Sequence, residues 1–490
     1  MTSPKSSNAM ANLPNALKTK PMASISTMSI ETNILEPITF SNSGCLFVLT
    51  NKGILDSGSR ITFSCTCPAG TDMFYYGKTG ISALIERATL RIGTTIVAET
   101  DSFGQYETIR KQFKTNEELL QKDSVKCGYW ASHVDDSGEG KGQLAYGRGV
   151  DNSAGVAAAV VDSKYKLTSD VSTTPIFSIG MSELFPMMHS VQLPLFVMAE
   201  AVSIDLRFKT QVGVKVSATR IGGDIAGVNY STADATDITV VPNKENCAFI
   251  ADYLTYTGDD GRMAETARIV SSEKGMVFPY QDLVLSASTI PAVADPGANI
   301  ASNQEIVRDI GLSGSSISTL VFADESPQAA TTSWLLGPYI SPAFITPDSF
   351  NINVNDNIVY NRPVVSETRR QSELAQVFGT DINVSMAEFC NNGHKDPTTL
   401  ATANPLWSVT AKLEGHSQNT SQGLNHYNGI NLNTSPVLAW GSGQLVGQKP
   451  IRITRTLPRS TTDYQARTQN CWAMVERVFN LKSGQVMVSA

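Results

Sequence analysis

The chain carries little charge. Aspartate, glutamate, lysine and arginine make up 17% of its 490 residues, whereas 41% are hydrophobic. Soluble domains usually carry about 25% charged residues. The formal net charge of −7 argues against a protein whose main surface binds nucleic acid, because such a surface needs an excess of basic side chains. Neutral surfaces and many short strands joined by turns are therefore expected.

Long apolar runs and a regular cysteine framework are also missing. No run approaches the roughly 18 apolar residues that span a bilayer, so no transmembrane helix is expected. The seven cysteines are scattered and odd in number, and the chain opens without the pattern of a secretory signal peptide. These features favour synthesis in a reducing cell interior.

Motifs for catalysis and cofactor binding are absent from the sequence. It contains no Walker loop, no dinucleotide-binding glycine pattern, no H-E-x-x-H and no G-x-S-x-G. Cys65 and Cys67 come nearest to a metal pair, but both share one face of a predicted strand with Ile61 and Phe63. Buried small hydrophobes are therefore expected there instead of metal ligands. We expect no enzyme, no cofactor and no metal.

Short strands dominate what is present. Residues 202–209 alternate strictly, and the apolar side chains on one face of this predicted strand are Val202, Ile204, Leu206 and Phe208. A period of two is typical of a half-buried strand. Similar short runs recur to the end of the chain, and helical spacing appears only briefly, at 106–122, 262–269 and 369–378. The sequence predicts an all-β protein with short helices in its loops.

An apolar segment at residues 184–198 precedes that strand. Pro186 and Pro194 forbid one long helix through it, so we expect a short helical turn near 182–188 and then a packed loop. Its candidate packing residues are Leu184, Phe185, Leu193, Pro194, Leu195 and Phe196. These side chains need a surface to bury against, either the sheets of their own chain or a neighbouring subunit. The residues alone leave that choice open.

The strand pattern divides the chain into two similar parts. Residues 1–35 hold few charged side chains and no acid before Glu31, which predicts a flexible N-terminal arm. Strands then fill residues 36–257, a turn and a short helix occupy 258–275, and strands resume over 276–490. This division favours a duplicated all-β sandwich.

Four stretches together resemble the double jelly-roll major capsid proteins of eukaryotic DNA viruses, which include polinton-like viruses, virophages and nucleocytoplasmic large DNA viruses. In chain order, the stretches are ATLRIGTTIV at 88–97; Leu184-Phe185 followed by QLPLF at 192–196 and the strand from Val202; Asp252 and Tyr253 through Arg262; and GQKPIRIT from Gly447 with NCWAMVERVFNL from Asn470. Each motif is weak alone, and the order and spacing make the match specific. The glycine-rich turn at 258–261 departs from the family pattern.

The resemblance implies two consecutive eight-stranded jelly-roll sandwiches, with Asp252, Tyr253 and Arg262 at their boundary. It also implies a major capsid protein that forms pseudo-hexagonal homotrimeric capsomers in an icosahedral shell, located in the virion. The expected partners are further copies of the chain, neighbouring capsomers, and penton and minor capsid proteins. The N-terminal arm would make weak contact with the genome or with internal proteins.

Two other classes of β-sandwich protein are alternatives. A carbohydrate-binding or spike protein would need an exposed aromatic platform, and the tryptophans available for one are Trp130, Trp334, Trp407, Trp440 and Trp472. A glycoside hydrolase built on a jelly roll would need two carboxylates about 5 to 9.5 Å apart across a cleft. No such acid pair stands out in the sequence.

Overall fold

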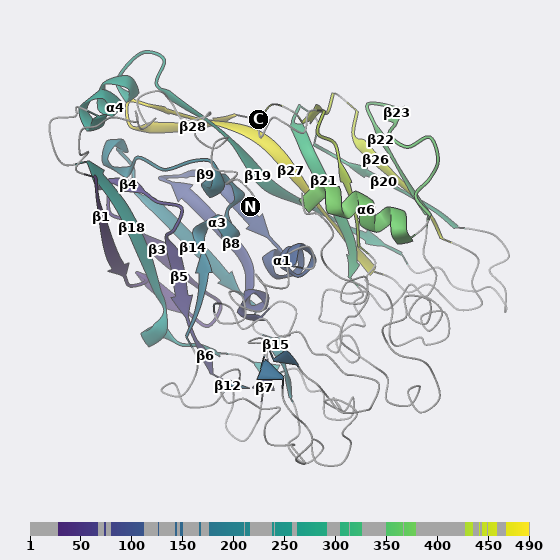
Figure 1. The fold of residues 1–490 in the computed structure, drawn as a ribbon, viewed down its shortest axis with the longest axis horizontal. Helices are drawn as coiled ribbons and strands as arrows, with labels where there is room; N and C mark the ends of the chain where they lie inside the picture. Colours follow the sequence, from purple (N-terminus) through teal and green to yellow (C-terminus); the bar gives the residue numbers. More distant parts are fainter. Residues whose placement is uncertain are drawn as a thin grey trace.

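Strands make up more than half of the residues that the computed structural model describes, with a few short helices beside them (Figure 1). The residues it describes are 28–66, 73–74, 80–111, 126, 143–144, 148–149, 166–167, 176–209, 211–215, 238–239, 241–256, 262–291, 304–312, 314–325, 349–365, 367–378, 427–434, 441, 443–447, 449–457 and 467–489. Among these residues, no helix has the length and apolar character to cross a membrane.

Eight strands of the first half build two antiparallel sheets. In chain order they are β1 (Met28–Leu35), β3 (Gly44–Val48), β5 (Arg60–Phe63), β8 (Ile85–Ile92), β9 (Thr95–Asp101), β13 (Phe177–Gly180), β14 (Val202–Phe208) and β18 (Ala248–Tyr256). One sheet has the order β1–β18–β5–β13, and the other has the order β3–β14–β8–β9. The first sheet thus joins the first, eighth, third and sixth strands, and the second sheet joins the second, seventh, fourth and fifth.

The second half repeats this arrangement. Its corresponding strands are β19 (Met276–Ile290), β20 (Gln304–Ile310), β21 (Ser316–Glu325), β22 (Ser349–Val354), β23 (Asn357–Ile358), β24 (Tyr427–Asn431), β26 (Ile451–Leu457) and β27 (Arg467–Lys482). The sheet orders are β19–β27–β21–β24 and β20–β26–β22–β23. Numbered within their half, these strands follow the order of the first half, so the two halves share one topology.

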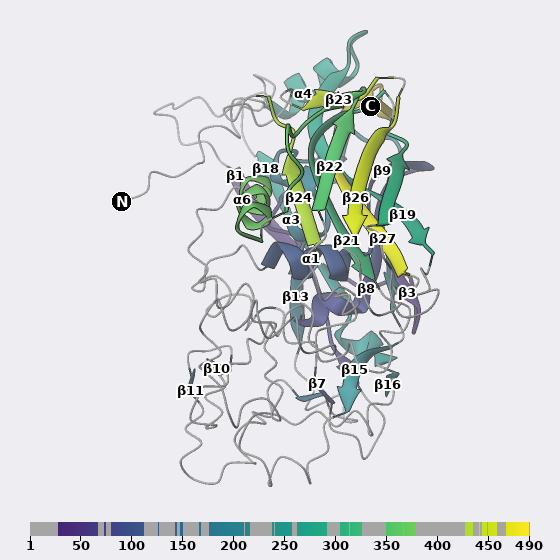
Figure 2. The same ribbon diagram turned by 90° about the vertical axis from the view of Figure 1, so that its right-hand side faces the viewer.

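Short helices and accessory strands lie between the main strands. The helices are η3 (Gly80–Leu84), α1 (Phe103–Lys111), α3 (Met181–Leu184), η6 (Pro186–His189), η7 (Leu195–Val197), η8 (Lys244–Asn246), α4 (Arg262–Val270) and α6 (Glu367–Phe378). The accessory strands are β2 (Thr39–Ser41), β4 (Ile54–Leu55), β6 (Cys65–Thr66), β7 (Met73–Phe74), β10 (Gln143–Leu144), β11 (Arg148–Gly149), β12 (Lys166–Leu167), β15 (Gln211–Lys215), β16 (Ile238–Thr239), β17 (Val241–Pro242), β25 (Gln444–Leu445) and β28 (Gln485–Ser489). Figure 2 looks onto the second half, where α6 packs beside β24.

Alternating side chains fill the space between paired sheets. In β14 every second residue is buried, with Val202, Ile204 and Leu206 fully inaccessible. The predicted strand and its buried face are therefore confirmed. β22 shows the same alternation in the second half, where Phe350, Ile352 and Val354 face the core. This is the pattern expected when one face of a strand packs inward and the other meets solvent or a neighbour.

The pair β19 and β27 extends beyond its own sandwich. The two strands pair over their whole length, from Met276 opposite Leu481 to Ile290 opposite Arg467. Along one face of this ribbon, Ala473 and Val475 belong to the core of the second half. Farther along the same face, Phe278 and its stacked partner Phe479 belong to the core of the first half. A single ribbon therefore contributes to both cores.

Three expectations change in detail. Residues 28–35, assigned to the arm, form β1, which pairs with Phe249–Tyr256 of β18. The β-branched Ile30, Thr32 and Ile34 suit a strand once a partner edge is available. Residues 1–27 lie outside the described residues. The stretch 88–97 that carries part of the family resemblance is not one strand but the hairpin β8–β9, with Gly93 in its turn at a φ of +56°. The helix expected at 106–122 begins three residues earlier, as α1 (Phe103–Lys111), and residues 112–122 lie outside the described residues.

Candidate functional site: the junction between the two halves

The apolar segment at 184–198 is built as predicted, from short helical turns separated by prolines. α3 ends at Leu184, Pro186 begins η6, and Pro194 precedes η7. Proline is tolerated at the first position of a helix because it has no N–H to leave unpaired there. The chain therefore turns twice within a few residues and presents apolar side chains in several directions.

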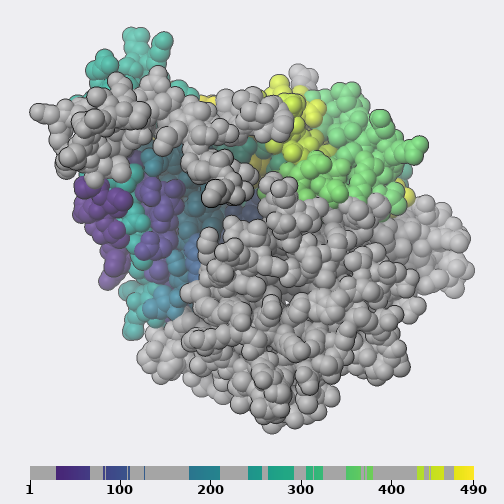
Figure 3. Space-filling model, viewed as in Figure 1, coloured from purple at the N-terminus to yellow at the C-terminus, as the bar shows by residue number. Residues whose placement is uncertain are grey.

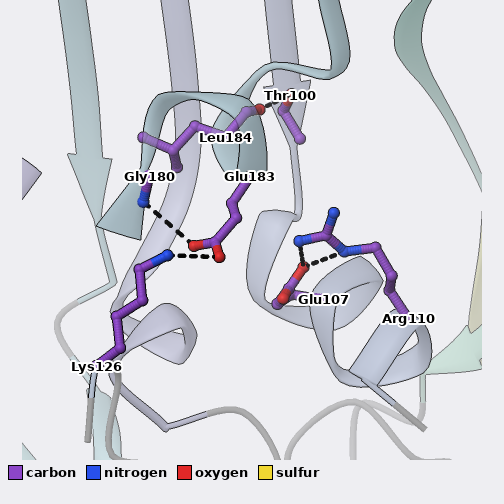
Figure 4. Close-up of polar contacts among 7 residues, drawn as sticks. All are labelled: Thr100, Glu107, Arg110, Lys126, Gly180, Glu183 and Leu184. Atoms are coloured by element: carbon purple, nitrogen blue, oxygen red, sulfur yellow. Dashed lines mark hydrogen bonds and ion pairs between the residues drawn. The ribbon is translucent and has the colours of Figure 1, made fainter. Parts of the chain in front are cut away.

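Polar contacts hold the start of this segment in place (Figure 4). The carboxylate of Glu183 accepts hydrogen bonds from the Gly180 N–H at 3.2 Å and from Lys126 Nζ at 2.6 Å. The Thr100 hydroxyl at the end of β9 donates to the Leu184 carbonyl at 2.7 Å, and this contact is buried. The segment is thus fixed to β9 by a hydrogen bond that is shielded from solvent.

All the predicted packing residues of the segment contact the interior of their own chain. Leu184, Phe185, Leu193 and Leu195 are completely buried, Pro194 is buried, and Phe196 is half-buried against the same core. The five buried side chains thus pack against the sheets of their own chain, and Phe196 does so on one side only.

The second half provides much of that cover. The backbone N–H of Ala199 donates to the carbonyl of Gly484 at 3.0 Å, in the turn between β27 and β28. That turn approaches so closely that a Cβ on Gly484 would lie 2.8 Å from the Ala199 Cβ. Met276 and Tyr280 of β19 and Leu481 of β27 share one apolar cluster with the segment. The segment therefore joins the two halves.

A buried carboxyl lies beside this apolar contact. Asp282 of β19 is 2% exposed, and its Oδ2 accepts a hydrogen bond from Arg477 Nη1 at 2.6 Å. Burial raises the pKa of the Asp282 carboxyl to about 7, although Arg477 opposes the rise. Two residues along β19, the Tyr280 hydroxyl donates to the Val97 carbonyl of β9 at 2.7 Å. Polar groups of both halves are thus matched across the junction.

The other face of the β19–β27 ribbon carries a second, aromatic part of the junction. Tyr106 of α1 lies with its ring centroid 6.0 Å from that of Trp472 on β27 and 6.2 Å from that of Phe378 on α6. The Trp472 indole N–H donates to the Asp101 carbonyl at 3.2 Å. Burial raises the pKa of the Tyr106 phenol to about 12. Helices from both halves therefore cover one face of the second half's sheet.

No family model matches the chain, and a search of curated proteins gave no sequence match. Solved structures do match. A chain in the structure of the Sputnik virophage aligns with a TM-score of 0.56 at 11% identity, covering 96% of this chain and 90% of that one. VP54 of PBCV-1 aligns at a TM-score of 0.54 with 12% identity, over 96% and 99% of the two chains. The Faustovirus major capsid protein gives 0.53 at 8% identity, over 95% and 92%.

These alignments span both sandwiches at once, as does the repeated strand order. The chain has the double jelly-roll fold. The fold predicted from the sequence is thus confirmed. In this double jelly roll, α4 lies between the last strand of the first jelly roll and the first strand of the second, inside the range 258–275 expected to link them.

The predicted boundary residues do not form one cluster in the double jelly roll. Asp252 faces outward on β18, where its carboxylate accepts from the Thr32 hydroxyl at 2.6 Å. Tyr253, the next residue, is fully buried in the first core, and Arg262 begins α4. Sequence reasoning missed Tyr106 and its partner Trp472 on β27, because nothing local signals that a helix of one jelly roll packs on the sheet of the other.

Several features weighed against a capsid role lie outside the described residues or inside the core. Cys65 is a free, fully buried thiol, as expected, whereas Cys67 lies outside the described residues. Within the described part of the chain, no group of acidic, histidine and cysteine side chains could hold a metal. Trp472 is 1% exposed and so cannot serve as a sugar platform, and the other four tryptophans are not among the described residues.

Proposed function

We propose that this double jelly roll is a major capsid protein whose chains form pseudo-hexagonal homotrimeric capsomers in an icosahedral viral shell. The role is structural and not catalytic, and its location is the virion. The proposal is supported by the similarity in fold to the Faustovirus major capsid protein and to a chain of the PBCV-1 capsid, over nearly the whole length of each. It also accords with the low charge of the chain, which leaves wide neutral surface for contact between copies.

The observation that carries the proposal is the core shared by the two jelly rolls. Domains joined by a linker alone move relative to each other unless a large apolar interface holds them. Here the 184–198 segment shares one apolar cluster with residues at one end of the β19–β27 ribbon, among them Phe278 and Phe479, and with Val486 of β28. Each chain therefore presents two modules of the same topology at a fixed angle. Three chains around one axis would place six such modules in a near-hexagonal ring.

The proposed partners follow from a near-hexagonal capsomer of this kind. Neighbouring capsomers would meet along its sides, penton proteins would fill the five-fold positions of the shell, and minor capsid proteins would bind beneath. Residues 1–27 precede β1 and would extend toward internal proteins or the genome. Their lysines at positions 5, 18 and 20, with no acid among them, suit weak contact with a polyanion.

Two measurements on the purified chain test the proposal. Light scattering coupled to size exclusion should give the mass of three chains, each of 52.7 kDa, and electron micrographs should show particles with hexagonal outlines. A stable monomer at micromolar concentration would overturn the proposal. In that case, monomers imaged as two lobes with a fixed spacing would still show that the junction between the two jelly rolls is rigid.

A further inference from the structure

Two buried thiols meet between the sheets of the first jelly roll. Cys45 is the second residue of β3, and Cys247 directly precedes β18, so the two belong to opposite sheets. Their sulfur atoms lie 3.9 Å apart, with the Cys247 thiol donating to Cys45 Sγ, although 202 positions separate the two residues along the chain. Both are free cysteines. Cys65 is buried in the same core and takes no part in this contact.

The separation of the two sulfur atoms is small enough for a disulfide bond to form. Bonded sulfur atoms lie about 2 Å apart, so the atoms of this pair must approach each other by about 2 Å. Each cysteine has a single side-chain torsion, and rotation about it moves the sulfur without moving the backbone. Because the hydrogen-bonded thiols already face each other, the pair is positioned for oxidation.

Both thiols lie close to exposed parts of the chain. Cys45 is 3% and Cys247 is 2% exposed, whereas residues 41–43 and 244–245, which precede them, are exposed. Figure 3 shows part of the segment 28–66, in purple, at the surface of the molecule. Local opening of a surface turn costs less free energy than global unfolding. A small oxidant can therefore reach the sulfur atoms when the β2–β3 turn or η8 opens.

The closed fold protects the pair from oxidation. The hydrogen bond from Cys247 and burial both raise the pKa of the Cys45 thiol. The thiolate is the reactive form of cysteine, so Cys45 does not react at neutral pH until the chain around it opens. A chain that folds under reducing conditions therefore keeps both thiols, and their oxidation comes later and slowly.

We propose that Cys45 and Cys247 form a disulfide site, which a hydroperoxide oxidises after folding, and that the bond locks the two sheets of the first jelly roll together. One thiolate attacks the hydroperoxide and becomes a sulfenic acid; the O–O bond breaks, and the leaving oxygen takes up the proton that this thiol released. The sulfur of the second thiol then attacks the sulfenic sulfur, so that the S–S bond forms, the S–O bond breaks and water leaves with the proton of the second thiol. The two sulfur atoms lose two electrons, which reduce the hydroperoxide.

The bond acts on stability through the unfolded chain. It joins residues 202 positions apart, and closing so long a loop removes much of the conformational freedom of the unfolded chain. The melting temperature should rise by about 5 °C or more, and the amide hydrogens of β3 and β18 should exchange more slowly. The inference goes beyond the proposed capsid function, and its chemistry does not depend on that function.

Hydrogen peroxide added to the full chain, after purification in reductant and removal of the reductant, tests the site. Mass spectrometry of a digest kept unreduced should find a peptide pair joined through Cys45 and Cys247, and dithiothreitol should reverse both the link and the rise in melting temperature. Cys45→Ala and Cys247→Ala should abolish the link and the rise. Cys471→Ala is the matched control and should keep both, because Cys471 is a free, buried thiol in the core of the second half.

Two results would overturn the proposal. One is that Cys45 and Cys247 of the unaltered chain stay unlinked under peroxide treatment that oxidises them in urea, a result that does not depend on how well the variants fold. The other is a link that changes neither the melting temperature nor the amide exchange of β3 and β18, because the bond would then not lock the sheets. Both leave the capsid function standing, since light scattering of the reduced chain tests that function separately.

Discussion

The buried carboxyl of Asp282 predicts how the junction responds to pH. The ordinary pKa of an aspartate is 3.8, and burial raises that of Asp282 to about 7 in the folded chain. The Arg477 guanidinium lowers it only in part, because 27% of that side chain is exposed and its charge is shared with water. Between these two pH values the folded chain holds a proton that the unfolded chain has released.

The sign and size of the effect follow from this difference. The contribution of Asp282 to stability is fully present below pH 3.8, where both states are protonated, and is lost as the pH rises through 7. A displacement from 3.8 to about 7, at 1.36 kcal/mol per unit, corresponds to about 4 kcal/mol. Ionised Asp282 therefore weakens the junction at pH 8 compared with pH 4.

The substitution Asp282→Asn isolates this contribution. Its amide oxygen can still accept from Arg477, but it does not ionise. We expect the variant to gain up to about 4 kcal/mol relative to the unaltered chain between pH 4 and pH 8, measured as the change in urea unfolding free energy at fixed protein concentration. Other carboxyl groups titrate in both proteins and cancel in the comparison.

A surface ion pair of the same residue types is the matched control. Asp309 forms two hydrogen bonds with Arg452, at 2.8 and 3.2 Å, and the pair is about half exposed. Its hydrogen bonds with Arg452 lower the pKa of Asp309, so Asp309→Asn should lower stability slightly at neutral pH and lose this effect in acid, where the carboxyl is protonated in both the folded and the unfolded chain. A pH-independent difference between the unaltered chain and Asp282→Asn would refute the reasoning, since it would mean that Arg477 keeps Asp282 ionised throughout.

Three further changes test the rest of the structure. Leu206→Asp places a charge on the fully buried face of β14 and should prevent folding, at a cost above about 4 kcal/mol, seen as loss of soluble protein; a soluble, cooperatively melting variant would contradict the core. Gly484→Ala should cost about 2 kcal/mol, because φ is +79° and the new Cβ would meet Ala199; an unchanged melting temperature would show that the turn moves freely. Deleting residues 1–27 should leave the melting temperature unchanged and weaken shell assembly, whereas extending the deletion to residue 35 removes β1 and should lower it by several degrees.

Local pattern explains the elements that were predicted well. Which face of β14 is buried follows from the alternation of its apolar and polar residues, whichever two strands flank it. Pro186 and Pro194 break the 184–198 segment into short turns whatever packs around it. The order of strands within each sheet could not be predicted in this way. The strand pattern indicated two similar sets of strands, and their pairing became visible only in the sheets.

The sequence by itself determined the all-β class, the faces of the clearest strands and the apolar character of the 184–198 segment, because each depends on residues a few positions apart. Only the tertiary structure decided what that segment touches. Its partners are the β27–β28 turn and the β19–β27 ribbon. They include Gly484, which lies 285 positions from Ala199 along the chain. An apolar side chain is driven from water without preference for a particular partner, so its burial can be predicted from composition, whereas its neighbours are fixed by how the sheets pack.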